Sequence, residues 1–449
     1  LYANTTGAQN TGVGYQALKA NTCGNRNIGI GHGVLYGNST GCNNVGIGYI
    51  ALRCSTTASN NTASGYYALK NTTTGCSNTA TGMCALAENT TGCRNEAFGG
   101  WSLQNNTTGS RNQAIGYNAL GANTCGIDNV AVGYNAIVSN TTGCWNVGIG
   151  RQALASNTTA NYNTAVGACT LYANTTGANN TAVGFCALKA NTTGSSNVAV
   201  GVCTLDSNTT GAMNTAVGMW AMQVNTTGLR NTAVGYRILE ANTTGSCNTA
   251  SGYHVMSTNT TGGYNTASGW RALKDNTTGN NNTALGFLAL TNGTTADFNV
   301  AVGSHSLYTN TTGACNTAVG RHALYSNTTA SYNTAYGACT LYANTTGANN
   351  TGVGYKALVA NTTGSHNTAS GFYALLSNTT ACFNTAVGFY SLLYTTTGGY
   401  NTAVGNYAGY ANTIGHGNVS VGYKASYCNS TGYRNIALGY GALYSNTTA

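Results

Sequence analysis

A seventeen-residue repeat runs through the 449-residue sequence and constrains its fold more than any other feature. Counted from Asn4, the repeat continues to Asn446 as 26 complete units without insertion or deletion, with a partial unit at each end. Residues 174–190 form one such unit, which reads N-T-T-G-A-N-N-T-A-V-G-F-C-A-L-K-A. A strict period predicts a repeat architecture, so we expect residues 1–449 to form one continuous array rather than several globular domains.

The sequence starts at Leu1 in the middle of one unit and stops at Ala449 just inside another, without an initiator methionine or a signal-peptide pattern. We therefore expect it to be an excerpt of a longer polypeptide or a processed segment. It also contains no apolar run long enough to cross a membrane as a helix, so we expect no membrane insertion within this segment.

Each unit divides into a corner and two extended segments when its places are numbered from one to seventeen. Places one to four read Asn-Thr-Thr-Gly or close variants, which favours a turn whose side chains bond their own backbone. Places five and six vary freely, as solvent-facing loop positions do. Places seven to eleven read Asn-Thr-Ala-Val-Gly and predict a short strand, and places twelve to fifteen, often Tyr-x-Ala-Leu, predict a second one.

Two short strands and two turns per unit predict an all-β fold: a parallel β-solenoid, or β-roll, in which each unit is one coil. Neighbouring coils then hydrogen-bond about 4.8 Å apart, so the whole array would make a rod of roughly 125 Å. Parallel stacking also brings each repeat place directly above the same place in the next coil.

Two places are invariant in all 26 units and predict structural columns. Asparagine at place seven predicts a ladder of side-chain amides that satisfy buried backbone groups of the neighbouring coil. Glycine at place eleven predicts a positive φ or the close approach of another backbone. The asparagine ladder includes Asn10, Asn27, Asn44, Asn180, Asn350 and Asn435. The glycine column includes Gly14, Gly31, Gly48, Gly184, Gly354 and Gly439.

The interior of such a coil is thin, because each unit offers only one valine, one leucine and two alanines to it. We expect further copies of the chain to cover the face formed by the glycine and alanine columns. The sequence therefore favours a homo-oligomer or fibre assembly, with a trimer as the preferred state.

Charge and titratable residues argue against several function classes. Only 5% of residues are charged, and the basic residues, such as Lys19, Arg26, Arg53, Lys70 and Arg94, are interpreted as isolated charges at different places. They then make no stripe for nucleic acid. The six histidines are expected to lie apart, and the seven acidic residues form no pair suited to acid–base catalysis. We expect no enzymatic activity, no cofactor and no metal.

The sixteen cysteines allow two interpretations. Cys76 and Cys93 share one place in successive coils, and Cys169, Cys186 and Cys203 share another. A coil spacing of about 4.8 Å lies within the Cα separation that a disulfide tolerates. These residues are therefore either disulfide staples of an extracellular fibre or free thiols that pack as small side chains.

The corner asparagines also allow two interpretations. Many of them begin an N-x-[ST] sequon, which is either incidental to good turn chemistry or an exposed glycan acceptor in a row along the rod. These candidate glycosylation sites include Asn4, Asn38, Asn89, Asn174, Asn191, Asn344 and Asn429.

Thirty tyrosines gather at a few places of the repeat. At these places the rings of successive coils would stack, which would stiffen the rod or present platforms for sugars. Place twelve carries Tyr15, Tyr49, Tyr66, Tyr117 and Tyr134, and place sixteen carries Tyr172, Tyr308, Tyr325 and Tyr342.

The core of the unit, N-T-A-V-G-Y-x-A-L, with variants at residues 146–150 and 197–201, resembles the head repeats of trimeric autotransporter adhesins. That resemblance implies trimeric, left-handed parallel β-rolls that bind host surfaces. The chain is also similar to the N-T-T-G-x-N-T-A-V-G arrays of phage and large-virus tail-fibre or surface-fibre proteins, and here the match includes the corner. The unit is longer than that of the adhesins, whose stalk heptads and membrane anchor do not occur in this sequence. Trimer state and handedness therefore rest on the resemblance.

These observations together favour a non-enzymatic, extracellular structural fibre on a cell or virion surface, with adhesion to cell-surface glycans through its repetitive exterior. Two alternatives remain at this point. Regularly spaced threonines are typical of ice-binding solenoids, although Glu96 and Gln113 interrupt the threonine column at place eight. The tyrosine columns would suit a carbohydrate-binding solenoid.

Overall fold

The computed structural model describes residues 2–448 and confirms the predicted all-β parallel solenoid. Each coil contributes one short strand, and every regular element among the described residues is a strand. The coils group into two compact units, one that ends at Thr227 and one that begins at Gly228. The single continuous array predicted for residues 1–449 stays a prediction.

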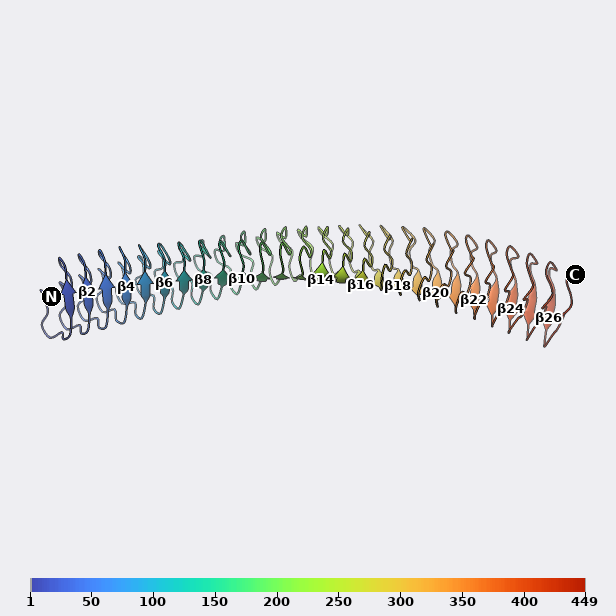
Figure 1. The fold of residues 1–449 in the computed structure, drawn as a ribbon, viewed down its shortest axis with the longest axis horizontal. Coiled ribbons are helices and arrows are strands. Elements are labelled where there is room, and N and C mark those ends of the chain that lie inside the picture. Colours follow the sequence, from blue (N-terminus) through green and yellow to red (C-terminus); the bar gives the residue numbers. More distant parts are fainter. Residues whose placement is uncertain (1, 449) are drawn as a thin grey trace. The chain divides into compact units, whose positions relative to one another are not determined.

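The N-terminal unit contains thirteen parallel strands, β1 to β13, and each pairs with the next at an offset of seventeen residues (Figure 1). Ala182 of β11 lies opposite Ala199 of β12, so each repeat place stacks on itself. The strands are β1 (Thr11–Val13), β2 (Ile28–Ile30), β3 (Val45–Ile47), β4 (Thr62–Ser64), β5 (Thr79–Thr81), β6 (Glu96–Phe98), β7 (Gln113–Ile115), β8 (Val130–Val132), β9 (Val147–Ile149), β10 (Thr164–Val166), β11 (Thr181–Val183), β12 (Val198–Val200) and β13 (Thr215–Val217).

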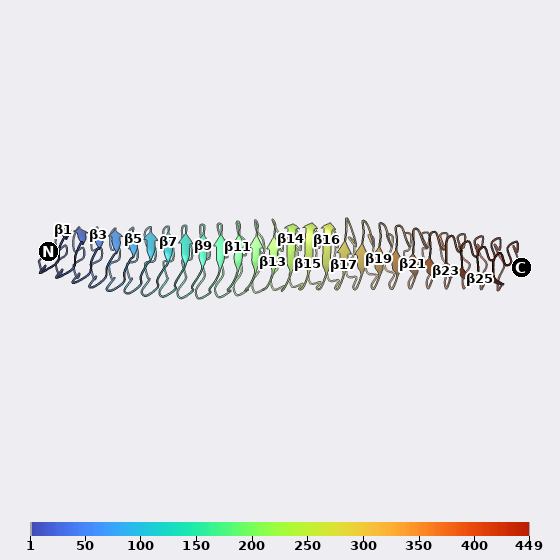
Figure 2. The same cartoon turned by 90° about the horizontal axis from the view of Figure 1, so that it is seen from below.

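The C-terminal unit repeats this arrangement with strands β14 to β26. Its first three strands are five residues long and continue through place twelve (Figure 2). The strands are β14 (Thr232–Tyr236), β15 (Thr249–Tyr253), β16 (Thr266–Trp270), β17 (Thr283–Leu285), β18 (Val300–Val302), β19 (Thr317–Val319), β20 (Thr334–Tyr336), β21 (Thr351–Val353), β22 (Thr368–Ser370), β23 (Thr385–Val387), β24 (Thr402–Val404), β25 (Val419–Val421) and β26 (Ile436–Leu438).

The second strand predicted for places twelve to fifteen is wrong, because the chain turns there instead. Places thirteen and fifteen adopt left-handed backbone conformations, as at Gln16 (φ +58°) and Leu18 (φ +51°). An extended strand cannot include such residues. The turn nevertheless continues the ladder between coils, since the Leu18 N–H donates to the Val34 carbonyl at 3.0 Å.

The core of a typical coil consists of two alanines and one large aliphatic side chain. In the coil of β11, Ala182 at place nine, Ala187 at place fourteen and Leu188 at place fifteen are fully buried. Val183 at place ten, by contrast, is 37% exposed. The prediction that the place-ten valine contributes to the core is therefore wrong. Alternation along a strand sends place nine inward and places eight and ten outward.

The predicted ladder at place seven is present. The Asn180 Nδ2 donates to the Oδ1 of Asn163 (3.2 Å) and to the carbonyl of Gly194 (2.9 Å). Its own Oδ1 accepts from the backbone N–H and the Nδ2 of Asn197 (3.0 and 3.2 Å). Asn27, Asn44, Asn180 and Asn350 are fully buried, whereas Asn10 and Asn435 at the two ends of the series are half-buried.

Both reasons proposed for the place-eleven glycines hold. Gly184 has a φ of +127°, and Gly14 and Gly439 have values of +119° and +114°. A Cβ on Gly184 would also lie 2.8 Å from the carbonyl carbon of Gly201 in the next coil. The column therefore requires both a backbone that L-residues avoid and close contact between coils.

Candidate interaction surfaces

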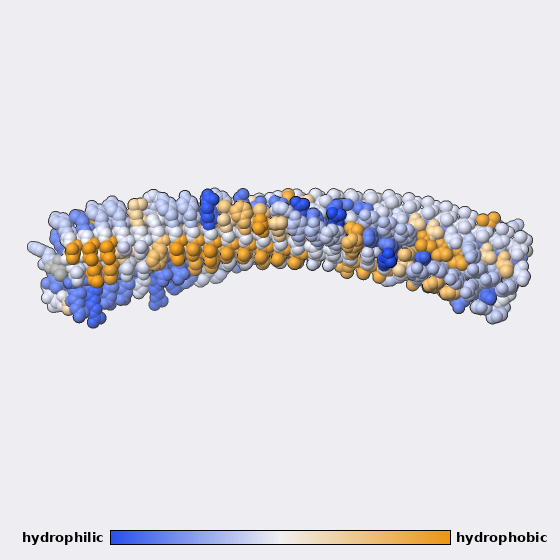
Figure 3. Space-filling model, in the orientation of Figure 1, coloured by the Kyte–Doolittle hydropathy of each residue, from blue (hydrophilic) through white to orange (hydrophobic). Residues whose placement is uncertain are grey.

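Places eight and ten of each coil form an exposed strip on the outer side of the strands, which we call the strand face. Its place-ten residues are mostly β-branched and substantially exposed, among them Val13, Ile30, Ile47, Ile115 and Ile149 in the N-terminal unit. Figure 3 shows apolar side chains gathered over the strands of this unit. This apolar strip, interrupted at Ser64 and Thr81, is a candidate interaction surface.

The strand face corrects the expectation that glycine and alanine columns meet a partner chain. The place-nine alanines, such as Ala165 and Ala182, are fully buried. The place-eleven glycines already contact the next coil. A partner can therefore reach the outward columns at places eight and ten, but not the small-residue columns.

The corner asparagines at place one form a second ladder inside the coil. The Asn191 Nδ2 donates to the Asn174 Oδ1 (2.8 Å) and to the carbonyl of Gly194 (2.9 Å), which closes the turn. Where Ser55 and Thr395 replace asparagine, the Oδ1 atoms of Asn38 and Asn378 in the preceding coils are buried without a partner.

The expectation that the corner asparagines are exposed is therefore wrong for all but the first of these candidate sites, and their glycosylation stays a prediction. Each of these side chains is at most 1% exposed, and a glycan on Nδ2 would displace its ladder bonds. Asn4, in the first coil, is exposed and its glycosylation stays a prediction. The buried sites are Asn38, Asn89, Asn174, Asn191, Asn344 and Asn429.

Place five has a role that the repeat pattern did not reveal. Its side chain accepts a hydrogen bond from the place-five N–H of the preceding coil, as from Ala178 to the Ser195 Oγ (3.1 Å) and from Asn280 to the Asp297 Oδ1 (2.6 Å). Several residue types can supply this acceptor, so the place looks freely variable. The sequence could have revealed this role, because Ser, Asn, Asp and Cys, which recur at place five, can all accept a hydrogen bond.

The cysteine pair predicted at place five lies in close contact. The Sγ atoms of Cys76 and Cys93 are 2.9 Å apart, and the Cys76 N–H donates to the Cys93 Sγ at 3.0 Å. Both thiols are free, and the hydrogen bond to Cys93 raises the pKa of Cys76. A raised pKa disfavours the thiolate that forms disulfides. The disulfide stays a prediction.

The second cysteine column, at place thirteen, differs from this pair. Cys169, Cys186 and Cys203 are also free thiols. Burial raises the pKa of Cys186 and of Cys203, and Cys186 is among the buried side chains. These features are typical of packing thiols, so Cys76 and Cys93 are the pair whose geometry favours a bond.

Stacked aromatic columns cover part of the exterior. In the N-terminal unit Tyr15, His32, Tyr49 and Tyr66 stack with ring centroids 5.1 to 5.3 Å apart. A hydrogen bond to Tyr67 raises the pKa of Tyr66 to about 12. Because each ring covers the face of the next, the column presents ring edges to solvent. A sugar stacks on the open face of a ring, and only the rings at the ends of a column have one. Sugar binding by these columns therefore stays a prediction, limited to their end rings.

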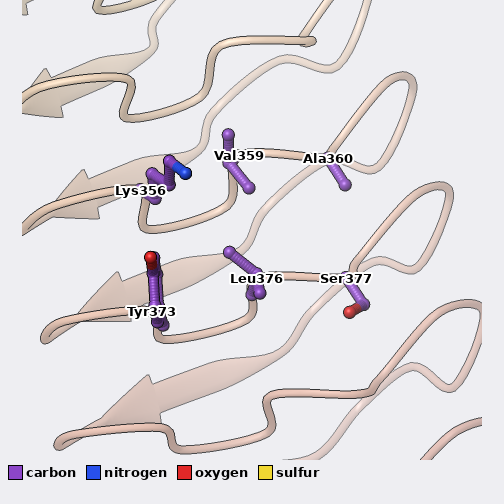
Figure 4. Close-up of a pocket in the computed structure, with 6 residues that line it drawn as sticks. All are labelled: Lys356, Val359, Ala360, Tyr373, Leu376 and Ser377. Atoms are coloured by element: carbon purple, nitrogen blue, oxygen red, sulfur yellow. The ribbon is translucent and has the colours of Figure 1, made fainter.

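An open groove of about 470 Å³ lies on the C-terminal unit beside one of these columns. Figure 4 shows Lys356, Val359 and Ala360 of one coil above Tyr373, Leu376 and Ser377 of the next. The Lys356 ammonium lies 5.3 Å from the ring centroid of Tyr355 and 5.7 Å from that of Tyr373. The groove is apolar with one cation at its edge.

The expectation that all histidines lie apart is wrong for one pair. His305 and His322 occupy place thirteen of successive coils, and their ring centroids are 5.2 Å apart. Burial lowers the pKa of His322, and the charges of Arg321 and His305 lower it further. Across residues 2–448, no three His, Cys, Asp or Glu side chains converge as a metal site would require.

The interpretation of the basic residues as isolated charges is also wrong in one region. Lys19, Arg53 and Lys70 all occupy place sixteen, with Tyr36 at the same place between the first two. We call these four residues the cationic column. Arg26 and Arg94 lie elsewhere, at place six. The absence of a nucleic-acid partner stays a prediction.

No helix in the described part of the chain is long and apolar enough to cross a membrane. Neither a scan against protein-family models nor a search of curated proteins finds a match for this chain.

Proposed function

We propose that the chain is a non-enzymatic structural fibre segment that assembles with copies of itself and adheres through its outer surface, on the exterior of a cell or virion. One observation carries this proposal. In both units the inward places repeat the same few residues, whereas the more exposed places five, six, twelve and sixteen change from coil to coil. Coils with the same interior can stack into a long array, and an exterior that varies from coil to coil suits recognition of a partner.

Self-assembly is the part of the proposal that the strand face supports. Each unit has thirteen strands that are about 4.8 Å apart, and a three-residue strand is about 10 Å long, so the strand face of each unit covers about 600 Å². Two such faces would bury about 1,200 Å², which is the lower end of the range for stable protein interfaces. A trimer is the assembly that the adhesin resemblance implies.

Sedimentation equilibrium of the purified chain tests self-assembly. We expect a mass that is a multiple of 45.6 kDa at micromolar concentration. Val183→Lys, Val200→Lys and Val217→Lys, introduced together on the strand face, should reduce it to 45.6 kDa, because the charges would be buried unpaired. Thr176→Lys, Thr193→Lys and Thr210→Lys, at exposed place three of the same three coils, provide the matched control. A monomeric native chain would contradict the proposal.

Ice binding is a second candidate, favoured by the exposed threonines at place three. The neighbouring threonines at place two turn inward, since the Thr192 Oγ1 donates to the Thr209 carbonyl at 3.1 Å. The corner therefore presents one threonine column rather than a two-dimensional array. Thermal hysteresis in a solution of the purified chain would favour ice binding over the fibre role.

A further inference from the structure

The cationic column is a straight row of side chains on four successive coils of the N-terminal unit. Its backbone is held in register, because the place-seventeen N–H of each coil donates to the place-sixteen carbonyl of the next. These bonds run from Ala20 to Tyr36 (3.0 Å) and from Cys54 to Lys70 (3.0 Å). With coils about 4.8 Å apart, the row spans about 14 Å along the stack.

No acidic residue precedes Glu88 in the sequence, so the first four coils carry only positive charge. The Glu88 Oε2 itself accepts a hydrogen bond from the Asn71 Nδ2 at 2.7 Å. Among residues 2–448, the ion pairs of the structure join other residues than those of the cationic column. Arg53 is exposed and Lys70 is half-exposed, so these charges face solvent without a neutralising partner.

Neighbouring aromatic rings hold the three cations in place. The Lys19 Nζ lies 5.3 Å from the ring centroid of Tyr36 and 3.4 Å from its hydroxyl oxygen. The Arg53 guanidinium lies 5.8 Å from the same centroid, and the Lys70 Nζ lies 4.9 Å from that of Tyr67. Cation–π contacts already restrict these long side chains, so binding a ligand costs less conformational entropy.

We propose that the cationic column binds a linear acidic polysaccharide, whose carboxylate or sulfate groups recur along an extended chain lying parallel to the stack. This inference rests on the adhesive role proposed above and names its partner. The cations recur at one-coil and two-coil intervals, about 5 and 10 Å. A polymer with a regularly repeated anionic group can contact all three cations at once.

Other polyanions fit the surface less well. Single-stranded nucleic acid needs open aromatic faces for its bases. Here Lys19 and Arg53 both lie at the Tyr36 ring, and the nearby place-twelve rings stack on one another. Proteins that bind duplex DNA often contact about 6–10 phosphates. Anionic membranes typically attract clusters of about 4–8 basic residues. The cationic column offers three.

Binding of the whole chain to immobilised polymers tests the proposal. The probes are polygalacturonate, dextran sulfate, neutral dextran, a single-stranded oligothymidylate and vesicles that contain phosphatidylserine. We expect binding to polygalacturonate, dextran sulfate or both, and none to neutral dextran. Affinity should fall about 10-fold or more between about 50 and 200 mM salt, as counterion release requires.

The column variant Lys19→Gln, Arg53→Gln, Lys70→Gln should lose at least about 10-fold in affinity, because all three contacts are removed. The control variant Arg26→Gln, Arg94→Gln, Arg151→Gln removes the same amount of charge from the N-terminal unit, but at repeat places other than sixteen. An equal loss in both variants would overturn the proposal, as would tighter binding to oligothymidylate or vesicles. Binding that persists in a monomeric chain would support it while contradicting self-assembly. An oligomer that binds neither acidic polymer would contradict the polysaccharide site alone.

Discussion

Replacing Asn180 by alanine should open the surrounding coils, with a loss of about 3 kcal/mol or more in local unfolding free energy. The side chain is fully buried and takes part in four hydrogen bonds. Its removal leaves the backbone N–H of Asn197 without its acceptor. A buried unsatisfied donor costs about 1–3 kcal/mol, and the other lost bonds add about 1 kcal/mol each.

Hydrogen exchange resolved to peptides of residues 174–205 measures this loss. A cost of about 3 kcal/mol corresponds to roughly 100-fold faster exchange where local opening limits the rate. The neighbouring Asn179→Gly is the matched control, since Asn179 is exposed, has a φ of +59° and tolerates glycine. If Asn180→Ala exchanges no faster than Asn179→Gly, the buried ladder does not stabilise the coil.

Gly184→Ala should be more damaging, with a loss of about 4 kcal/mol or more. Alanine at a φ of +127° is strained by about 1–3 kcal/mol, and its Cβ would collide with the carbonyl oxygen of Gly201. The backbone fixes the position of the Cβ, and the carbonyl oxygen is itself a backbone atom, so neither can move without separating the two coils. Limited proteolysis should then cut the chain near residue 184, where the native chain resists.

Gly177→Ala is the control for this change. Gly177 lies in the same coil at place four, where other coils carry Ala160 or Ala330 and the backbone avoids positive φ. A Cβ at Gly177 would also approach a backbone oxygen of the next coil, that of Gly194, but the coils with Ala160 and Ala330 accommodate such a Cβ, so we expect a smaller loss than at Gly184. Equal resistance to proteolysis in Gly184→Ala and Gly177→Ala would contradict the strain that positive φ imposes at Gly184.

The repeat predicted the columns of the solenoid well, because in a parallel stack each residue neighbours copies of itself. Asparagine in every unit required a partner for its amide, and the neighbouring asparagine supplies it. Glycine in every unit indicated either a positive φ or close approach of another backbone, and Gly184 shows both. Such inferences need only the period and the chemistry of one residue type.

Orientation and turn conformation were harder to predict. Alternation shows that Val183 and Ala182 face opposite sides, but not which side is inside. The larger residue was expected to be buried, yet Ala182 and Leu188 fill the interior and Val183 is 37% exposed. Leu188 adopts a φ of +51°, which residue propensities disfavour, because the chain must reverse while burying that side chain. The corner asparagines gave no sign of burial, since a turn sequence usually lies at the surface.

The assignment of repeat places to the inside or the outside is the central claim, and the five native methionines test it directly. Met83, Met213 and Met219, at outward places six and twelve, are 45%, 56% and 37% exposed. Met222 and Met256, at place fifteen, are fully buried. Dilute hydrogen peroxide followed by peptide mass spectrometry should oxidise the first three while the buried pair stays reduced, because sulfoxide formation requires access to the sulfur. Oxidation of Met222 and Met256 at the rate of Met83 in the folded chain would contradict the fold described here.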